Sequence, residues 1–116
     1  MSTLWIYHNP ACSKSRGAVN LLRERGADFE IREYLGEPLD RAELAALLTR
    51  LDAAPAELVR KDSSFEALGL DASDYTTTDS VIALLVAHPK LMQRPIAVRG
   101  DRAVIARPSE RVLELL

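Results

Sequence analysis

The sequence has 116 residues, of which 47% are hydrophobic and 28% charged, and its 15 Lys and Arg against 17 Asp and Glu leave a formal net charge of −2. This length and composition fit one domain over residues 1–116 and exclude a disordered, collagen-like or low-complexity chain. With an isoelectric point near 5.7, no apolar run of the ~18 residues that span a membrane and no signal-peptide layout at the start, we expect a cytoplasmic protein that binds neither nucleic acid nor membrane.

The first third of the chain predicts a strand, a helix and a second strand. Residues 4–7 are aromatic and branched, as in a buried strand. Helical periodicity runs from Ser15 to Arg25, and Gly26 can supply the left-handed cap that ends a helix. A mostly alternating apolar pattern then predicts a second strand over 29–35. Two strands joined by a helix are expected to form a parallel βαβ unit with a right-handed crossover.

Residues 39–90 predict a helical insert. Asp40 and Glu43 have the spacing of a capping box, and the apolar positions that follow fall on one helix face. Those positions are Leu44, Leu47, Leu48 and Leu51. Shorter helices are expected over 55–60, 64–68 and 81–87, the last capped by Thr78 or Asp79.

The end of the chain predicts a β-hairpin and a closing helix. Residues 96–99 and 102–105 flank Gly100 and Asp101, which suit a tight antiparallel turn. A helix follows from Pro108 and Ser109. Its apolar face is expected to include Val112, Leu113 and Leu116. The order β-α-β, helices, β-β-α places the chain in the α/β class, as a thioredoxin-like four-stranded mixed sheet with an inserted helical subdomain.

Cys12 is the only cysteine and lies in the turn between the first strand and the first helix. A single thiol excludes an internal disulfide, a Cys-x-x-Cys pair and a multi-thiolate zinc site. The helix start favours a thiolate, and Lys14, Arg16 and His8 are nearby. The alternative is a small buried hydrophobe, but the polar setting is wrong for a core. We therefore expect Cys12 to be a nucleophile with a pKa below that of an ordinary thiol.

Two residues near Cys12 could each have more than one role. Ser15 stands where two-thiol redox proteins carry their second sulfur, and it could cap the helix or hydrogen-bond the Cys12 sulfur. His8 could be a base, a residue that tunes the thiol, or a hydrogen-bonding partner within the turn. With His88 as the only other histidine, we expect no metal site.

Three arginines are distinguished by their context. Arg60 ends a short predicted helix, while Arg94 and Arg107 precede prolines at the two outer ends of the hairpin. Strand ends in open α/β folds converge near the first βα turn, where ligands bind. Guanidinium groups bind oxyanions bidentately, so we expect the three to hold an anion beside Cys12. The alternative is that they are solvated surface cations.

Residues 8–16, with the sequence HNPACSKSR, match the opening signature of a known family at every fixed place. Arg60, Arg94 and Arg107 match that family's three arginines in order and context, including the Pro-Ile and Pro-Ser pairs that follow the second and third. Over nearly its whole length, the chain therefore resembles the glutaredoxin-coupled arsenate reductases, and in length it resembles their short branch.

The resemblance implies an activity and its residues. Cys12 would attack arsenate, displacing an oxygen to form a thiol–arsenate adduct, with His8 and Ser15 as catalytic neighbours. The implied oxyanion-binding residues are Arg16, Arg60, Arg94 and Arg107. Glutathione, as co-substrate, would attack the adduct, and glutaredoxin would remove the glutathione as arsenite is released, with no bound cofactor. The Arg94–Pro95 bond could be cis, as is common at this place in thioredoxin-like proteins, or it could be an ordinary trans bond at the start of a strand.

Two other functions remain open at this point. The fold and the first motif also resemble the Spx-like regulators, which bind RNA polymerase and do not turn over a substrate. Those regulators typically have Cys-x-x-Cys, and Ser15 counts against a thiol switch. The other alternative is a monothiol oxidoreductase acting on glutathione mixed disulfides, in which the three arginines would matter little.

Overall fold

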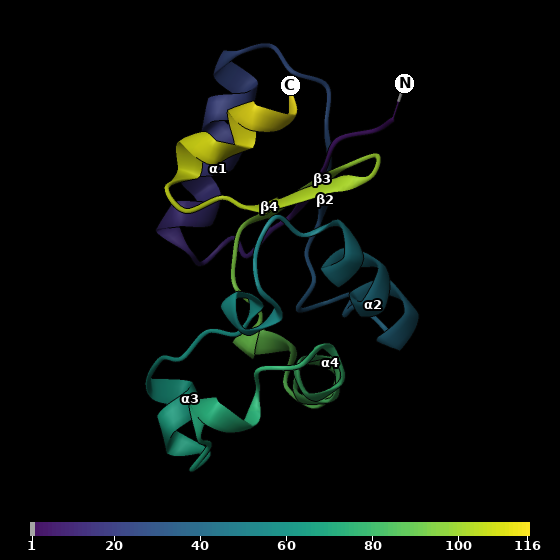
Figure 1. Ribbon diagram of the computed structural model, residues 1–116. Coiled ribbons are helices and arrows are strands. Elements are labelled where there is room, and N and C mark those ends of the chain that lie inside the picture. The colour runs from purple at the N-terminus through teal and green to yellow at the C-terminus, as the bar shows by residue number, and fades with distance from the viewer. Residues whose placement is uncertain (1) are drawn as a thin grey trace.

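The computed structural model describes residues 2–116, whose centre is a four-stranded mixed sheet in the order β2-β1-β3-β4 (Figure 1). The strands are β1 (Trp5–Tyr7), β2 (Glu30–Arg32), β3 (Ile96–Arg99) and β4 (Arg102–Ile105). β1 pairs in parallel with β2 and antiparallel with β3, which pairs antiparallel with β4. The predicted α/β fold, with its mixed sheet and antiparallel hairpin, is confirmed.

The predicted helices occur in the expected order, and the structure adds two short 3-10 helices, Ala72–Asp74 and Pro89–Leu91, that were not predicted. The α-helices are α1 (Ser13–Glu24), α2 (Arg41–Arg50), α3 (Ser63–Ala67) and α4 (Thr78–Ala87), and the 3-10 helices are η1 (Pro55–Leu58), η2 (Ala72–Asp74), η3 (Pro89–Leu91) and η4 (Ser109–Leu115). None of the helices within residues 2–116 has the length and apolar character needed to cross a bilayer.

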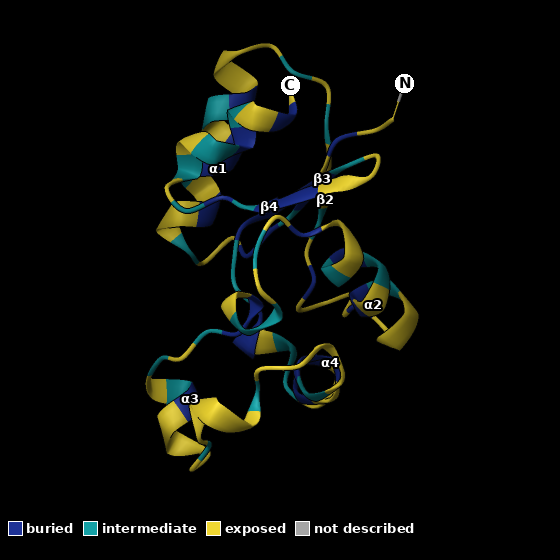
Figure 2. Cartoon of the chain, viewed as in Figure 1, coloured by how far each residue is buried: buried dark blue, intermediate teal, exposed yellow. Residues whose placement is uncertain are grey.

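The sheet has a hydrophobic cluster on each face because successive side chains of a strand point to opposite sides. Ile6 and its antiparallel partner Ala97 face α1 and η4, where they join Val19, Leu22 and Val112. The opposite face packs against the helical insert. Figure 1 shows α1 and η4 on one side of the sheet and α2 on the other, and Figure 2 shows buried residues along the strands between them.

Backbone contacts join the insert to the sheet. An isolated β-bridge pairs Val59 with Met92, and the N–H of Arg60 donates to the Leu91 carbonyl (2.6 Å). The N–H of Gln93 donates in turn to the Leu58 carbonyl (2.7 Å). The end of η1 therefore runs beside the segment that leads into β3, and it brings residue 60 next to residues 92–94.

Several element boundaries differ from the prediction. β2 ends at Arg32 and not at residue 35, because it is an edge strand and the chain turns away after it. The Arg32 guanidinium stabilises that turn by donating to the carbonyls of Glu37 (3.0 Å) and Pro38 (2.9 Å). Tyr34, expected in the strand, is buried within the turn.

The other differences lie at helix ends. α1 begins at Ser13, so Cys12 is its N-cap residue. The N-cap of α4 is Thr77, whose hydroxyl accepts from the N–H of Ser80, and not Thr78 or Asp79. The closing helix is 3-10, and its tighter winding buries Leu115 and leaves Leu116 exposed, contrary to the expected face.

Candidate functional site

Cys12 lies at the N-terminus of α1, where the backbone N–H groups of the first turn have no partner within the helix. Its backbone is extended, and its side chain is partly exposed. Burial of the thiol acts to raise its pKa. The Ser15 N–H, the Arg94 guanidinium and the Lys14 N–H outweigh that burial by hydrogen-bonding to the sulfur, and they leave the pKa of Cys12 below its ordinary value. The group is therefore ready to act as a thiolate nucleophile.

The loop before Cys12 is held by its own polar groups. The Asn9 side-chain oxygen accepts from the N–H of Ala11 (3.0 Å), and the Asn9 carbonyl accepts from the N–H of Cys12 (3.0 Å). Arg16, expected to bind the oxyanion, donates from Nη1 to the Pro10 carbonyl (2.9 Å). In this structure Arg16 therefore stabilises the loop before Cys12 through an exposed hydrogen bond.

Ser15 and His8 form a buried pair behind the same loop. The fully buried Ser15 Oγ lies 2.9 Å from His8 Nδ1 and accepts from the N–H of Asn9 (3.0 Å). Burial lowers the pKa of His8, and so do the charges of Arg23 and Arg16. The Ser15 hydroxyl thus neither caps the helix nor bonds to the sulfur; it ties His8 to the loop, while the Ser15 N–H faces Cys12.

Arg94 comes from the segment that enters β3 and places its guanidinium against the Cys12 sulfur. The peptide bond that follows it, Arg94–Pro95, is cis, which decides between the two isomers that the sequence left open, and Arg107–Pro108 is cis as well. Arg94 is the predicted arginine that lowers the pKa of the Cys12 thiol.

Arg60 approaches the same region from the insert. Its Nη1 lies 2.8 Å from Asp62 Oδ2. The other carboxylate oxygen, Asp62 Oδ1, accepts from the N–H groups of Ser64 (3.1 Å) and Phe65 (3.2 Å) at the start of α3. The positive charge of Arg60 acts on the Tyr34 hydroxyl, as do the charges of Arg94 and Cys12. Arg60, Arg94 and Cys12 therefore all lie within electrostatic reach of one buried hydroxyl.

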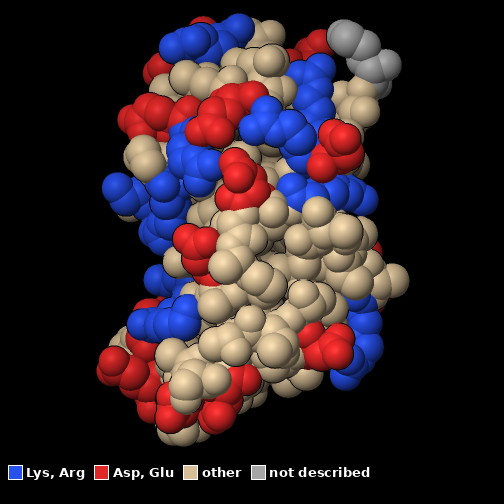
Figure 3. All heavy atoms as spheres, in the orientation of Figure 1, with Lys and Arg blue, Asp and Glu red and all other residues tan. Residues whose placement is uncertain are grey.

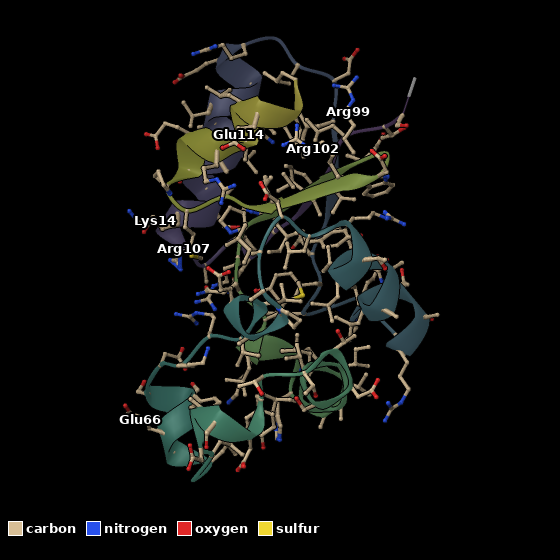
Figure 4. All side chains as sticks on the ribbon, in the orientation of Figure 1. Lys14, Glu66, Arg99, Arg102, Arg107 and Glu114 are labelled. Carbon is tan, nitrogen blue, oxygen red and sulfur yellow. The ribbon has the colours of Figure 1, made fainter. Side chains whose placement is uncertain are left out.

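Arg107 leaves β4 on the same side of the molecule. Its Nη1 donates to the Gln93 side-chain oxygen (3.2 Å), and Ser109 Oγ donates to the Lys14 carbonyl in the first turn of α1 (2.9 Å). Figure 4 shows Arg107 beside Lys14, and Figure 3 shows Lys and Arg side chains along this flank. Arg107 also lines an open groove of about 500 Å³ with Lys61.

Sequence reasoning missed Tyr34. It was assigned to a strand on its apolar character, whereas the structure buries its ring in the core and places its hydroxyl near Arg94. Burial raises the pKa of Tyr34 above its ordinary value. No local pattern marks such a residue, because its surroundings come from three separate segments. Within residues 2–116, no group of three or more His, Cys, Asp and Glu side chains is placed to hold a metal ion.

Comparison with known proteins extends the likeness over the whole chain. The ArsC family model matches residues 7–115. The chain is 45% identical to the Escherichia coli K12 protein YfgD over 96% of this chain and 94% of the relative. It is 41% identical to an arsenate reductase of Escherichia coli K12, covering 100% of this chain and 82% of the relative. A solved arsenate reductase from Vibrio cholerae superimposes with a TM-score of 0.86 at 36% identity, covering 99% and 98% of the two chains.

Proposed function

The chain belongs to the ArsC family, and we propose that it is an arsenate reductase that forms a thiol–arsenate adduct on Cys12 and resolves it with glutathione and glutaredoxin. The observation that carries the proposal is the position of the Cys12 sulfur, which faces two N–H groups of α1 and the guanidinium of Arg94. A thiolate beside fixed positive charge is suited to attack an oxyanion, because the same groups stabilise the charge on the oxygens. Arg60 and Arg107, on the neighbouring segments, complete the proposed oxyanion site.

The proposed reaction begins with the Cys12 thiolate. Its sulfur forms a bond to arsenic as one arsenate oxygen leaves, protonated, as water, and arsenic stays pentavalent. Glutathione forms a second sulfur–arsenic bond with loss of another water. A glutaredoxin thiolate then attacks the glutathione sulfur, giving a mixed disulfide, and the electron pair of the broken sulfur–arsenic bond reduces arsenic to the trivalent state. Water releases arsenite and restores the Cys12 thiol.

Dependence on outside thiols follows from the cysteine content. Cys12 is the only cysteine of the sequence, so a disulfide that takes up the two electrons cannot form within the chain. We place the reaction in the cytoplasm, where thiol reductants keep a lone cysteine reduced.

A steady-state assay with arsenate, glutathione, glutaredoxin and a coupled NADPH readout tests the proposal. Cys12→Ser should abolish turnover, and omission of either thiol component should do the same. Lys in place of Arg60, Arg94 or Arg107 should lower kcat/KM for arsenate at least about tenfold, because Lys keeps the charge and loses the bidentate fork. Arg99→Lys is the matched control, since Arg99 donates to the carbonyls of Ser2 and Leu115, away from the thiol.

Each contrary outcome points to a different function. Unchanged turnover in Cys12→Ser would remove the mechanism. Absence of arsenate reduction, together with turnover of a glutathione mixed disulfide that is undiminished in all three arginine variants, would indicate a monothiol oxidoreductase. No turnover, together with recovery of RNA polymerase in a pull-down, would indicate an Spx-like regulator.

A further inference from the structure

Two polar groups beside Cys12 are buried without a hydrogen-bond partner. Within the described residues 2–116, two buried side-chain atoms lack a hydrogen-bond partner: the Tyr34 hydroxyl oxygen and the Arg94 Nε. Nearly all such groups in native proteins are paired, and each exception calls for an explanation. Arg94 acts on the Cys12 thiol, and both Arg94 and Cys12 act on the Tyr34 hydroxyl, so a shared cause is indicated.

The surroundings of Tyr34 limit what that cause can be. The residue is 1% exposed. The small space of about 10 Å³ beside it is lined by Leu39, Leu44, Leu85, Pro89 and Met92, whose side chains offer no hydrogen-bonding oxygen or nitrogen. The Arg94 guanidinium approaches the hydroxyl without reaching the geometry of a full hydrogen bond, and Arg60 and Cys12 act on the hydroxyl through their charge. A partner for the hydroxyl is therefore to be sought on the Cys12 side.

The two unpaired groups require the same kind of partner. Burial raises the pKa of Tyr34, so its hydroxyl stays protonated at neutral pH and can donate. The Arg94 Nε–H is a donor only. An oxygen with several lone pairs satisfies both donors, and such an oxygen is carried by any tetrahedral oxyanion that binds next to the Cys12 sulfur.

We propose that the Tyr34 hydroxyl and the Arg94 Nε bind one oxygen of the oxyanion held at Cys12, so that Tyr34 is a substrate-binding residue. This inference rests on the proposed function for the identity of the anion. The Tyr34 hydroxyl can accept a hydrogen bond as well as donate one, whereas an arginine side chain can only donate. The hydroxyl can donate to a charged oxygen of arsenate and accept from a protonated oxygen of the adduct, and it adds no charge to the site.

Tyr34→Phe tests the proposal, because it removes one oxygen and keeps the ring in the core. Arsenate binding is measured by calorimetry in the Cys12→Ser protein, where no adduct forms, with and without Tyr34→Phe. We expect the dissociation constant to rise about tenfold, the usual effect of losing one hydrogen bond to a charged group. Tyr75→Phe, which alters a ring packed edge-on against Phe65 in the insert, should leave it unchanged.

A purely structural role predicts a different pattern. If the hydroxyl stabilises the fold, Tyr34→Phe lowers the urea midpoint of the anion-free protein and leaves arsenate affinity as it was. The proposal expects the reverse, because in the anion-free protein the hydroxyl approaches Arg94 but makes no full hydrogen bond that the substitution could remove. Equal dissociation constants overturn the proposal, and so does a Cys12→Ser protein that binds no arsenate, since the proposed contact does not involve the sulfur.

Turnover separates this inference from the proposed function. In the coupled assay, Tyr34→Phe should lower kcat/KM for arsenate about tenfold and leave the KM for glutathione unchanged. If the wild-type protein does not reduce arsenate but binds it more tightly than the Tyr34→Phe protein does, the proposed function fails and the role of Tyr34 stands. If the wild-type and Tyr34→Phe proteins reduce arsenate with the same kcat/KM, the proposed role of Tyr34 fails and the proposed function stands.

Discussion

Opposing effects determine the acidity of Cys12. Partial burial disfavours the thiolate, whereas the N–H groups of Ser15 and Lys14 and the side chain of Arg94 stabilise it, and the balance lowers the pKa of the thiol. The N–H groups belong to the helix and follow from local sequence. Arg94 comes from the other end of the chain, so its contribution depends on the tertiary fold.

This balance predicts the pH dependence of thiol reactivity. Because the folded protein favours the thiolate, the rate of iodoacetamide alkylation should reach half its maximum below pH ~8.5, the value of an ordinary thiol. Arg94→Met should move that midpoint upward, and Arg99→Met should not. The same shift makes the native state lose stability as the pH falls through the midpoint, because the unfolded thiol binds its proton first. A wild-type midpoint at or above ~8.5 would contradict the assignment.

Among the elements, α2 shows how a local signal and a tertiary contact combine. The predicted capping box is confirmed: the N–H of Glu43 donates to the Asp40 carboxylate (2.8 Å), and the N–H of Asp40 donates to the Glu43 carboxylate (3.2 Å). Glu43 also pairs with Arg32 of β2, whose Nη2 lies 3.1 Å from Oε1. The start of α2 is thereby tied to the edge strand that precedes Tyr34.

Removal of the cap should weaken this connection. Asp40→Ala is expected to lower the free energy of unfolding by about 1 kcal/mol, because the Glu43 N–H loses its partner. Asp79→Ala is the matched control, since Asp79 lies in the first turn of α4 but the cap there is Thr77. Urea denaturation of both variants measures the difference, and equal losses would show that the carboxylate acts only through charge at the helix start.

At the scale of the molecule, the insert and the sheet share one hydrophobic cluster. Leu47, Leu58 and Leu84 of the insert belong to the same cluster as Ile96 and Val98 of the sheet. The insert therefore buries its apolar side chains against β3 and has no separate core of its own. The proposed oxyanion site takes Arg60 from the insert and Cys12 from the start of α1, so the shared cluster also fixes the position of one relative to the other.

The shared cluster predicts one cooperative unfolding transition over residues 1–116. Trp5, the only tryptophan, reports on β1, whereas the far-ultraviolet circular dichroism reports largely on the helices, most of them in the insert. Both signals should give the same urea midpoint, as expected for a single domain of this size. Separate midpoints would mean that the insert unfolds independently.

Features that depend on residues close together in the chain could be predicted from the sequence alone. Helical periodicity, the Asp40–Glu43 cap, the Gly100–Asp101 turn and the position of Cys12 before a helix are local, and local hydrogen bonds and side-chain spacing specify them. They were sufficient for the order of the strands and the longer helices and for the choice of Cys12 as the candidate nucleophile.

Tertiary structure alone decided where the edge strand ends, which face η4 buries, and what surrounds the thiol. These depend on contacts between residues far apart in the chain, whose formation is governed by packing and burial and leaves no periodic trace in the sequence. Tyr34 illustrates the difference, since its apolar ring indicated only a strand. Its hydroxyl acquired a candidate role because the fold buries it near Arg94, Arg60 and Cys12.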